Sequence, residues 1–229
     1  MVMTMKLSPL RTMKTLYTLG VLVRDPNQLS KVFDMADALA TPDMLAPMVE
    51  TLRREPGGAR AFAERPRLRV ELATLRLLPR GTLGREFAEQ MIAKGLDPAA
   101  LPHLPSTDDH SFLRAHLYET HDVWHAVTGF DTDWVSEIGL QAFYLAQIPG
   151  PLSAALVAVG CLRIARFEME SRERVMDAIV RGWTMGRRAR PFFGVRWNEL
   201  WDVPLEDVRK QLGIATAVPA SESLSARAA

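Results

Sequence analysis

The sequence contains a single cysteine, Cys161, among its 229 residues. One thiol cannot form an internal disulfide or a zinc site built from several thiolates, so the chain is typical of a reducing compartment. Because Cys161 lies within an apolar run with helical spacing, we expect it to be a small buried side chain and not a nucleophile.

The chain also lacks a strong charge of either sign and a long hydrophobic run. Its formal net charge is +1, which gives no bulk electrostatic reason to bind nucleic acid. The longest apolar segment, residues 152–167, carries two arginines and falls short of the ~20 residues that a membrane-spanning helix needs. Residues 16–23 are apolar but lack a following small-residue cleavage site, so no signal peptide is predicted. These features favour a cytoplasmic protein.

Strand-like alternation is scarce, whereas apolar residues recur at helical spacing along most of the chain. Apolar residues make up 48% and charged residues 24% of the sequence, which is ordinary for a globular protein with a full core. We therefore predict an all-α fold, a single-domain stack of about ten helices over residues 1–214. Residues 215–229 contain few bulky apolar side chains and are predicted to form a disordered tail.

Turn-forming residues divide the chain into helices. Pro26 and Pro42 are each predicted to begin a helix, where a missing backbone N–H costs nothing. Gly57 and Gly58 are predicted to end the second of these helices, and a loop with three prolines is expected over residues 96–110. Further helices are predicted at Ser111–Thr128, Trp134–Gln147, Leu152–Met169, Ser171–Arg188 and Leu205–Leu212.

The most informative stretch, residues 114–141, contains two histidines four positions apart. On a helix, His121 and His125 lie on one face and one turn apart. This is the spacing with which a helix offers two nitrogen ligands to one metal ion. Asp122 lies beside His121 and can add an oxygen from the edge of the same face. The three residues therefore predict part of a metal site.

A carboxylate farther along the chain completes the predicted site. On an unbroken helix Glu137 would lie ~24 Å from His121 and point to nearly the opposite side. Gly129 is instead expected to end the first helix, and an Asp or Thr among residues 131–133 to cap a second. A helical hairpin centred near residue 131 brings Glu137 back to His125, because both are six residues from that point.

Two histidines, one aspartate and one glutamate form an oxygen-rich ligand set suited to zinc, iron, manganese or magnesium. The remaining histidines lack such a partner set and are expected to be loop or surface residues: His103, His110 and His116. The aromatic side chains near the predicted site are expected to be core residues: Trp124, Phe130, Trp134, Phe143 and Tyr144.

Several motifs together resemble a known family. The segment HDVWHAVTGFDTDWVSE contains HDxxH, eleven further residues and a glutamate. Upstream stand RDPNQLSKVFDMADAL, ERP and LPRGTLGREFAEQMIAKGLDP, and the chain ends with PFFGVRWNELWDVPLEDVRKQLGI before its tail. These motifs resemble the coenzyme Q biosynthesis protein 4 family over about residues 15–214. The chain departs from the family at Trp124, where leucine is more common.

The resemblance implies an all-α, peripheral membrane protein that handles polyprenyl lipids. It implies a divalent metal, usually zinc, with a ligand and catalytic set formed by His121, Asp122, His125 and Glu137. It further implies removal of the C1 carboxyl group from a polyprenylated hydroxybenzoate. The alternative is a non-catalytic isoprenoid-binding scaffold for other quinone-biosynthesis enzymes. A homodimer is expected from the resemblance alone.

Arg80 is a candidate contact for an anionic head group, with Thr82 and Gly84 nearby in the GTLG turn. The alternative for this segment is a turn followed by a helix cap. The methionine-rich N-terminus also has two interpretations. It forms either ordinary core or an apolar face that docks on a membrane, with a basic rim of Lys6, Arg11 and Lys14.

Two hydrolase classes share parts of the HDxxH pattern. A zinc protease would use both histidines and Glu137 as ligands and Asp122 as base, but an aspartate is one methylene shorter than the glutamate expected there. A phosphohydrolase with an HD pair needs another histidine upstream, and His116 is poorly spaced for that role. Both classes rank below the family interpretation.

Overall fold

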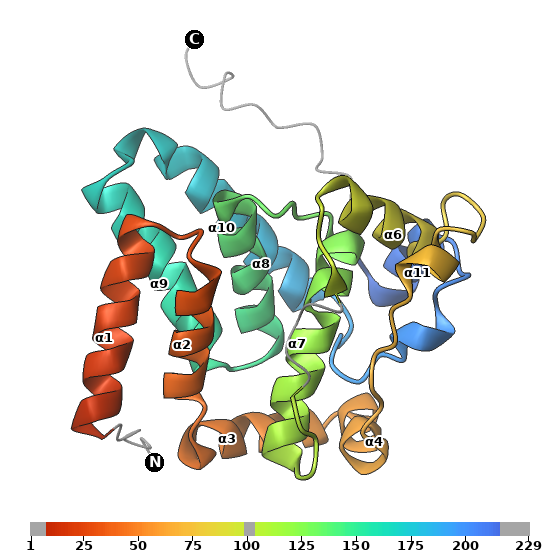
Figure 1. The fold of residues 1–229 in the computed structure, drawn as a ribbon, viewed down its shortest axis with the longest axis horizontal. Coiled ribbons are helices and arrows are strands. Elements are labelled where there is room, and N and C mark those ends of the chain that lie inside the picture. The colour runs from red at the N-terminus through yellow and green to blue at the C-terminus, as the bar shows by residue number, and fades with distance from the viewer. Residues whose placement is uncertain (1–7, 99–103, 216–229) are drawn as a thin grey trace.

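The computed structural model describes residues 8–98 and 104–215, and these residues form an all-helical domain (Figure 1). This confirms the predicted fold class. Within the described residues, two short 3-10 helices, Met169–Ser171 and Trp197–Glu199, accompany the α-helices. The α-helices are α1 (Pro9–Arg24), α2 (Leu29–Leu39), α3 (Pro42–Arg53), α4 (Pro56–Glu64), α5 (Leu72–Leu75), α6 (Leu83–Ala93), α7 (Asp109–Thr128), α8 (Trp134–Gln147), α9 (Pro151–Arg166), α10 (Arg172–Arg188) and α11 (Leu205–Leu212).

Local capping explains why the helices that carry the predicted site begin and end where they do. The Asp108 side chain accepts a hydrogen bond from the backbone of Ser111, whose hydroxyl accepts one from the Asp108 backbone, so α7 starts with a capping box. Prolines occupy the first turn of α1, α3, α4 and α9, where helices tolerate them. The predicted bounds of α8 and α11 match the observed ones.

Two predicted helix boundaries are wrong, the start of α2 and the end of α3. Pro26 lies in a turn, and α2 begins three residues later at Leu29 with Gln28 as N-cap. Gly57 and Gly58 do not end α3, but lie in the first turn of α4, which Pro56 begins. A Cβ atom at Gly58 would lie 2.1 Å from the carbonyl oxygen of Leu52, so this glycine permits the close approach of the two helices.

The buried apolar side chains form three clusters, and α7 contributes to the largest of them. Figure 1 shows α1 and α2 side by side at one end of the molecule and α6 with α11 at the other, with α7 between them. The larger apolar core contains side chains from α3, α4, α6, α7, α8 and the C-terminal segment. A smaller core joins α1, α2 and α9. The region between the two cores is where a cavity forms.

Glycines allow α8 and α10 to cross at very short distance. A Cβ atom at Gly182 of α10 would lie 1.9 Å from the backbone oxygen of Gly139 in α8. On another side of α8, a Cβ atom at Gly139 would lie 2.4 Å from the ring of Phe130. The backbone of α8 is therefore held tightly between α10 and the turn that precedes it.

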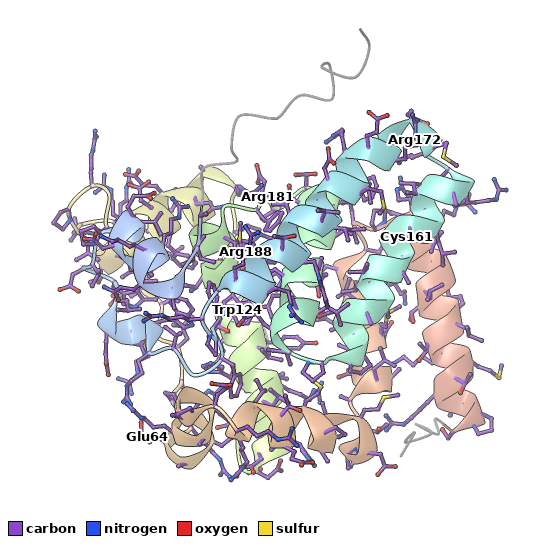
Figure 2. The ribbon with its side chains drawn as sticks, turned by 180° about the vertical axis from the view of Figure 1, so that it is seen from behind. Glu64, Trp124, Cys161, Arg172, Arg181 and Arg188 are labelled. Atoms are coloured by element: carbon purple, nitrogen blue, oxygen red, sulfur yellow. The ribbon has the colours of Figure 1, made fainter. Side chains whose placement is uncertain are left out.

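Two predictions about burial are also wrong. Cys161 is exposed on α9 (Figure 2), because the buried side of that helix is formed by neighbouring positions such as Leu156 and Val159. His116 is not a surface residue but is 3% exposed. Its ring packs against Phe112 and Phe193, and the second partner comes from a distant segment that periodicity does not reveal.

The other predictions about side chains have mixed outcomes. His110 lies in the first turn of α7, and His103 lies outside the described residues. Most of the expected core aromatics are buried, whereas Trp134 is only half-buried.

The predicted tail lies outside the described residues from position 216 onward. Within the described ranges, no helix has the length and apolar character needed to cross a bilayer.

Candidate metal centre

The chain reverses between α7 and α8 as the sequence predicts. Gly129 follows α7 with a φ angle of 70°, and its N–H donates to the carbonyl of His125, which is a usual helix ending for glycine. Asp133 then caps α8 by accepting hydrogen bonds from the backbone N–H groups of Val135 and Ser136. This turn places Glu137 in the first turn of α8 and directs it back to α7.

The structure brings His121, His125 and Glu137 together as predicted. One ligand atom from each residue lies within 4.8 Å of the others. Nε2 of His125 is 3.1 Å from one oxygen of Glu137, and Nε2 of His121 is 3.9 Å from the other. Two imidazole nitrogens and one carboxylate are the protein ligands of a well-known class of catalytic zinc sites. The group can therefore hold a divalent metal ion.

The proton of the neutral His125 ring lies on Nδ1, so Nε2, the nitrogen near Glu137, is available to bind a cation. Its Nδ1 lies 3.0 Å from the carbonyl oxygen of Phe130, and a carbonyl can only accept, so Nδ1 carries the proton. In the neutral ring, Nε2 then presents a lone pair. This atom is buried and has no hydrogen-bond partner among the described residues, although Glu137 is close. A metal ion would satisfy both the lone pair and the carboxylate.

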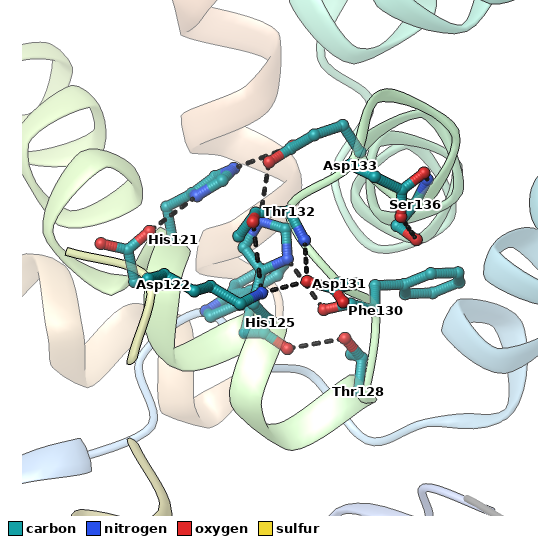
Figure 3. Close-up of polar contacts among 12 residues, drawn as sticks. His121, Asp122, His125, Thr128, Phe130, Asp131, Thr132, Asp133 and Ser136 are labelled. Carbon is teal, nitrogen blue, oxygen red and sulfur yellow. Dashed lines mark hydrogen bonds and ion pairs between the residues drawn. The ribbon is translucent and has the colours of Figure 1, made fainter. Parts of the chain in front are cut away.

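Asp122, the fourth predicted ligand, is placed differently from the other three. Its carboxylate oxygen lies 3.4 Å from Nδ1 of His121 (Figure 3), and it is not part of the three-residue group. A carboxylate on the far nitrogen of a ligating histidine orients that ring and makes it a stronger ligand. This contact leaves Nε2 of His121 facing Glu137. A direct Asp122–metal bond remains a prediction.

The two carboxylates dominate the electrostatics of the site. Burial lowers the pKa of His121, but the nearby Asp122 and Glu137 outweigh it and the net shift is upward. Burial raises the pKa values of Asp122 and Glu137, yet their contacts with the histidines leave both lowered. Both carboxylates are therefore ionised at neutral pH, which favours a bound cation.

The candidate metal-binding group borders a cavity of about 340 Å³. His121, Asp122 and Glu137 line part of it, and apolar side chains line most of the remainder. These apolar residues come from α2, α3, α7 and α9 and from Ile148, which directly follows α8. They include Val32, Leu45, Leu117, Leu152 and Leu156. The volume lies in the range of ordinary ligand sites. An apolar ligand with a polar head fits this distribution.

The helical spacing of the aromatic residues predicts Tyr144 as a core residue, and the sequence motifs do not include Gln141. Both line the cavity, Gln141 four residues and Tyr144 seven residues after Glu137 on α8, so a helical stripe counted from Glu137 would have found them. Burial raises the pKa of the Tyr144 phenol well above its usual range, and the charges of Asp122 and Glu137 add to this. Tyr144 therefore remains an O–H donor at neutral pH.

The three candidate head-group residues near residue 82 are not brought to the cavity. Arg80 is exposed, and the Thr82 hydroxyl donates to the carbonyl of Pro79. Thr82 precedes α6 as its N-cap residue without making a side-chain cap hydrogen bond. The N–H of Gly84 donates to the backbone of Trp201. These contacts join α6 to the C-terminal segment, and a head-group role for the three residues stays a prediction.

Comparison with known proteins shows similarity along nearly the whole chain. A family model described as "Coenzyme Q (ubiquinone) biosynthesis protein Coq4" matches residues 4–218. The mitochondrial ubiquinone biosynthesis protein COQ4 of Pyricularia oryzae is 29% identical over 199 residues, which cover 83% of this chain and 64% of that protein. The Yarrowia lipolytica protein of the same name is 28% identical over 190 residues, covering 80% of this chain and 71% of its own length. The chain thus spans about two thirds of these relatives.

A solved structure shares the fold. The crystal structure of a candidate ubiquinone biosynthesis protein from Nostoc punctiforme aligns with a TM-score of 0.78 and 34% sequence identity. The alignment covers 88% of this chain and 97% of the other. The similarity therefore includes α7, α8 and the surrounding helices rather than a single motif.

Proposed function

The chain belongs to the coenzyme Q (ubiquinone) biosynthesis protein Coq4 family, and from this premise we propose that it removes the C1 carboxyl group of a polyprenylated hydroxybenzoate. The observation that carries the proposal is a metal-binding His–His–Glu group beside a largely apolar cavity. Such a substrate has a long hydrocarbon tail and a small aromatic head with oxygen groups. The tail matches the apolar part of the cavity wall, and the head matches the part lined by His121, Asp122 and Glu137.

The apolar wall would hold the prenyl tail. Side chains such as Leu45, Leu117 and Leu156 border the cavity from three different helices. Burial of hydrocarbon contributes roughly 25 cal/mol per Å², so the tail supplies most of the affinity. The head is then placed by the polar end of the cavity, where His121, Asp122 and Glu137 lie.

Residues of this chain would bind the metal ion and transfer the proton that the reaction needs. His121, His125 and Glu137 would hold a divalent cation, zinc first and iron, manganese or magnesium as alternatives. Such a cation supplies Lewis acidity, drawing electron density from head-group oxygens. When the carboxyl group leaves as CO₂, its bonding electrons stay on the ring carbon, and a proton must reach that carbon. Asp122 and Glu137 border the cavity. Because both are ionised at neutral pH, either would first take a proton from water and then pass it to the ring carbon.

We also propose that the substrate enters from a membrane surface. Leu29 lines the cavity and is 57% exposed, which connects the cavity with the outside. Large apolar side chains are exposed on the neighbouring helix α1: Leu10, Met13 and Leu16. An exposed apolar patch of this kind is typical of a membrane-contact site.

The predicted basic rim of this patch has another role in the structure. Arg11 donates to backbone carbonyls at the end of α2, and Lys14 pairs with Asp34. Both residues therefore hold α1 against α2, and Lys6 lies outside the described residues. Flotation with phosphatidylcholine vesicles tests the patch. We expect Met13→Asp to reduce the floating fraction, and unchanged flotation would refute membrane contact at α1.

One experiment separates catalysis from the scaffold alternative. The purified chain is analysed for metal and for extracted lipid, and then incubated under air with a prenylated 4-hydroxybenzoate. Release of CO₂ with formation of the decarboxylated ring, absent in Glu137→Gln, supports the proposal. A bound prenyl lipid with no product in any metal-loaded form would refute decarboxylation and favour an isoprenoid-binding scaffold.

A further inference from the structure

The hydroxyl group of Tyr144 is buried without a hydrogen-bond partner among the described residues. A few other buried polar side-chain atoms share this property, including ring nitrogens of Trp124 and Trp197. Tyr144 differs from them because it lines the apolar cavity beside the metal-binding group. Its hydroxyl is thus an unused donor in the part of the molecule where a ligand head would lie.

The ring of Tyr144 is held in a fixed position. It stacks on Trp124 with ring centres 4.0 Å apart and an interplanar angle of 12°. It also lies nearly parallel to the imidazole of His121, with ring centres 5.9 Å apart. The residue as a whole is 6% exposed. Tyr144 is therefore rigidly placed beside a ligand residue of the candidate metal centre.

Packing alone does not explain a tyrosine at this position. A phenylalanine would keep both ring contacts and avoid the cost of a buried hydroxyl without a partner, which is of the order of 1–3 kcal/mol. A bound ligand that accepts a hydrogen bond would remove this cost. Gln141, one turn earlier on α8, adds a second polar group to the same cavity wall.

We propose that Tyr144 is a substrate-binding residue whose hydroxyl donates a hydrogen bond to an oxygen of an anionic aromatic head group. This inference rests on the proposed function. An aromatic ring that carries a carboxylate and a hydroxyl presents oxygens in different directions. One oxygen group can face His121, His125 and Glu137 while the other accepts from Tyr144. The two contacts together would select ligands with both groups over plain prenyl hydrocarbons.

The test compares two probes that differ only in their head. The first is 3-geranylgeranyl-4-hydroxybenzoate, and the second is geranylgeranylbenzene, which lacks both oxygen groups. Dissociation constants are measured calorimetrically in detergent micelles for the full chain and for Tyr144→Phe. We expect the variant to bind the hydroxybenzoate roughly ten- to a hundredfold more weakly, as for a lost hydrogen bond to a charged group. Binding of the hydrocarbon probe should not change.

Tyr17→Phe serves as the matched control because it removes the same hydroxyl from an exposed position on α1. It should leave binding of both probes unchanged. The melting temperature gives an independent readout. Tyr144→Phe should melt no lower than the unmodified chain, because the hydroxyl that it removes makes no hydrogen bond within the described residues.

The outcomes separate this inference from the proposed function. If the unmodified chain prefers the hydroxybenzoate but Tyr144→Phe binds it equally well, the role of Tyr144 is refuted and the proposed function stands. Equal weakening of both probes, with a lower melting temperature, would show a packing role and likewise refute the inference. If the unmodified chain binds neither probe, the proposed function fails and this inference with it.

Discussion

Nδ1 of His125 donates a hydrogen bond to the carbonyl oxygen of Phe130, 3.0 Å away, across the turn that ends α7. The ring of Phe130 is itself held from two sides. The guanidinium of Arg181 in α10 lies 4.4 Å from the ring centre, and Gly139 of α8 permits close contact with it. Arg181 also donates to the carbonyl of Thr128 at the end of α7. The orientation of one imidazole in the candidate metal centre therefore depends on packing between three helices.

Replacing His125 by alanine should abolish metal binding while leaving most of the helical fold intact. The substitution removes one nitrogen from a group with only three ligand atoms. Metal content after reconstitution, measured by mass spectrometry, should fall to background, and the far-ultraviolet circular dichroism should change little. His110→Ala, which alters another histidine of α7 outside the group, should keep full occupancy. Full occupancy in His125→Ala would refute the assignment.

Asp122→Asn should weaken metal binding less than Glu137→Gln. Asp122 contacts Nδ1 of His121, and loss of such a supporting carboxylate typically costs roughly ten- to a hundredfold in metal affinity. Glu137 contributes a ligand atom itself, so its loss should be more severe. Competition with a chelator measures both affinities. If the two variants lose metal equally, Asp122 is a direct ligand, as the sequence pattern suggests.

His116 should make the protein less stable in mild acid. Burial lowers its pKa from 6.5 to about 4, so between these values the unfolded chain binds a proton that the folded chain does not. Stability is therefore unaffected by His116 above pH 6.5 and falls as pH decreases toward 4. The loss between pH 7.5 and pH 5 is about 2 kcal/mol.

Urea unfolding of the full chain and of His116→Phe at these two pH values tests this expectation. The variant keeps an aromatic ring between Phe112 and Phe193 but cannot take up the proton. Its decrease in unfolding free energy on acidification should be smaller by about 2 kcal/mol. Equal decreases in both proteins would show that His116 is not the group responsible.

Gly182→Ala should destabilise the fold through the crossing of α8 and α10. The added methyl group would lie 1.9 Å from the carbonyl oxygen of Gly139, and backbone at a helix crossing cannot move away cheaply. We expect a loss of about 3 kcal/mol, at the upper end for overpacked cores. Gly20→Ala is the control, because nothing lies within 4 Å of the added atom in α1. It should stabilise by about 0.5–1 kcal/mol. Urea unfolding measures the change in unfolding free energy for both variants. Equal changes in the two would contradict the close crossing of α8 and α10.

Local sequence by itself determined the helix pair that carries the candidate site. Gly129 ends α7 and Asp133 caps α8 because such signals act through hydrogen bonds over three or four residues. The spacing of His121 and His125 places both rings on one face for the same local reason. The return of Glu137 to that face then follows from the length of the turn.

Tertiary packing alone decided what surrounds these groups. Tyr144 borders a cavity only because α2, α3 and α9 form its remaining walls, and no local pattern shows that these helices meet there. His116 is buried because Phe193, far along the chain, covers it. Thr82 lies against the C-terminal segment and away from the cavity. Hydrogen bonds within a turn depend on near neighbours, whereas burial depends on which distant surfaces exclude water together.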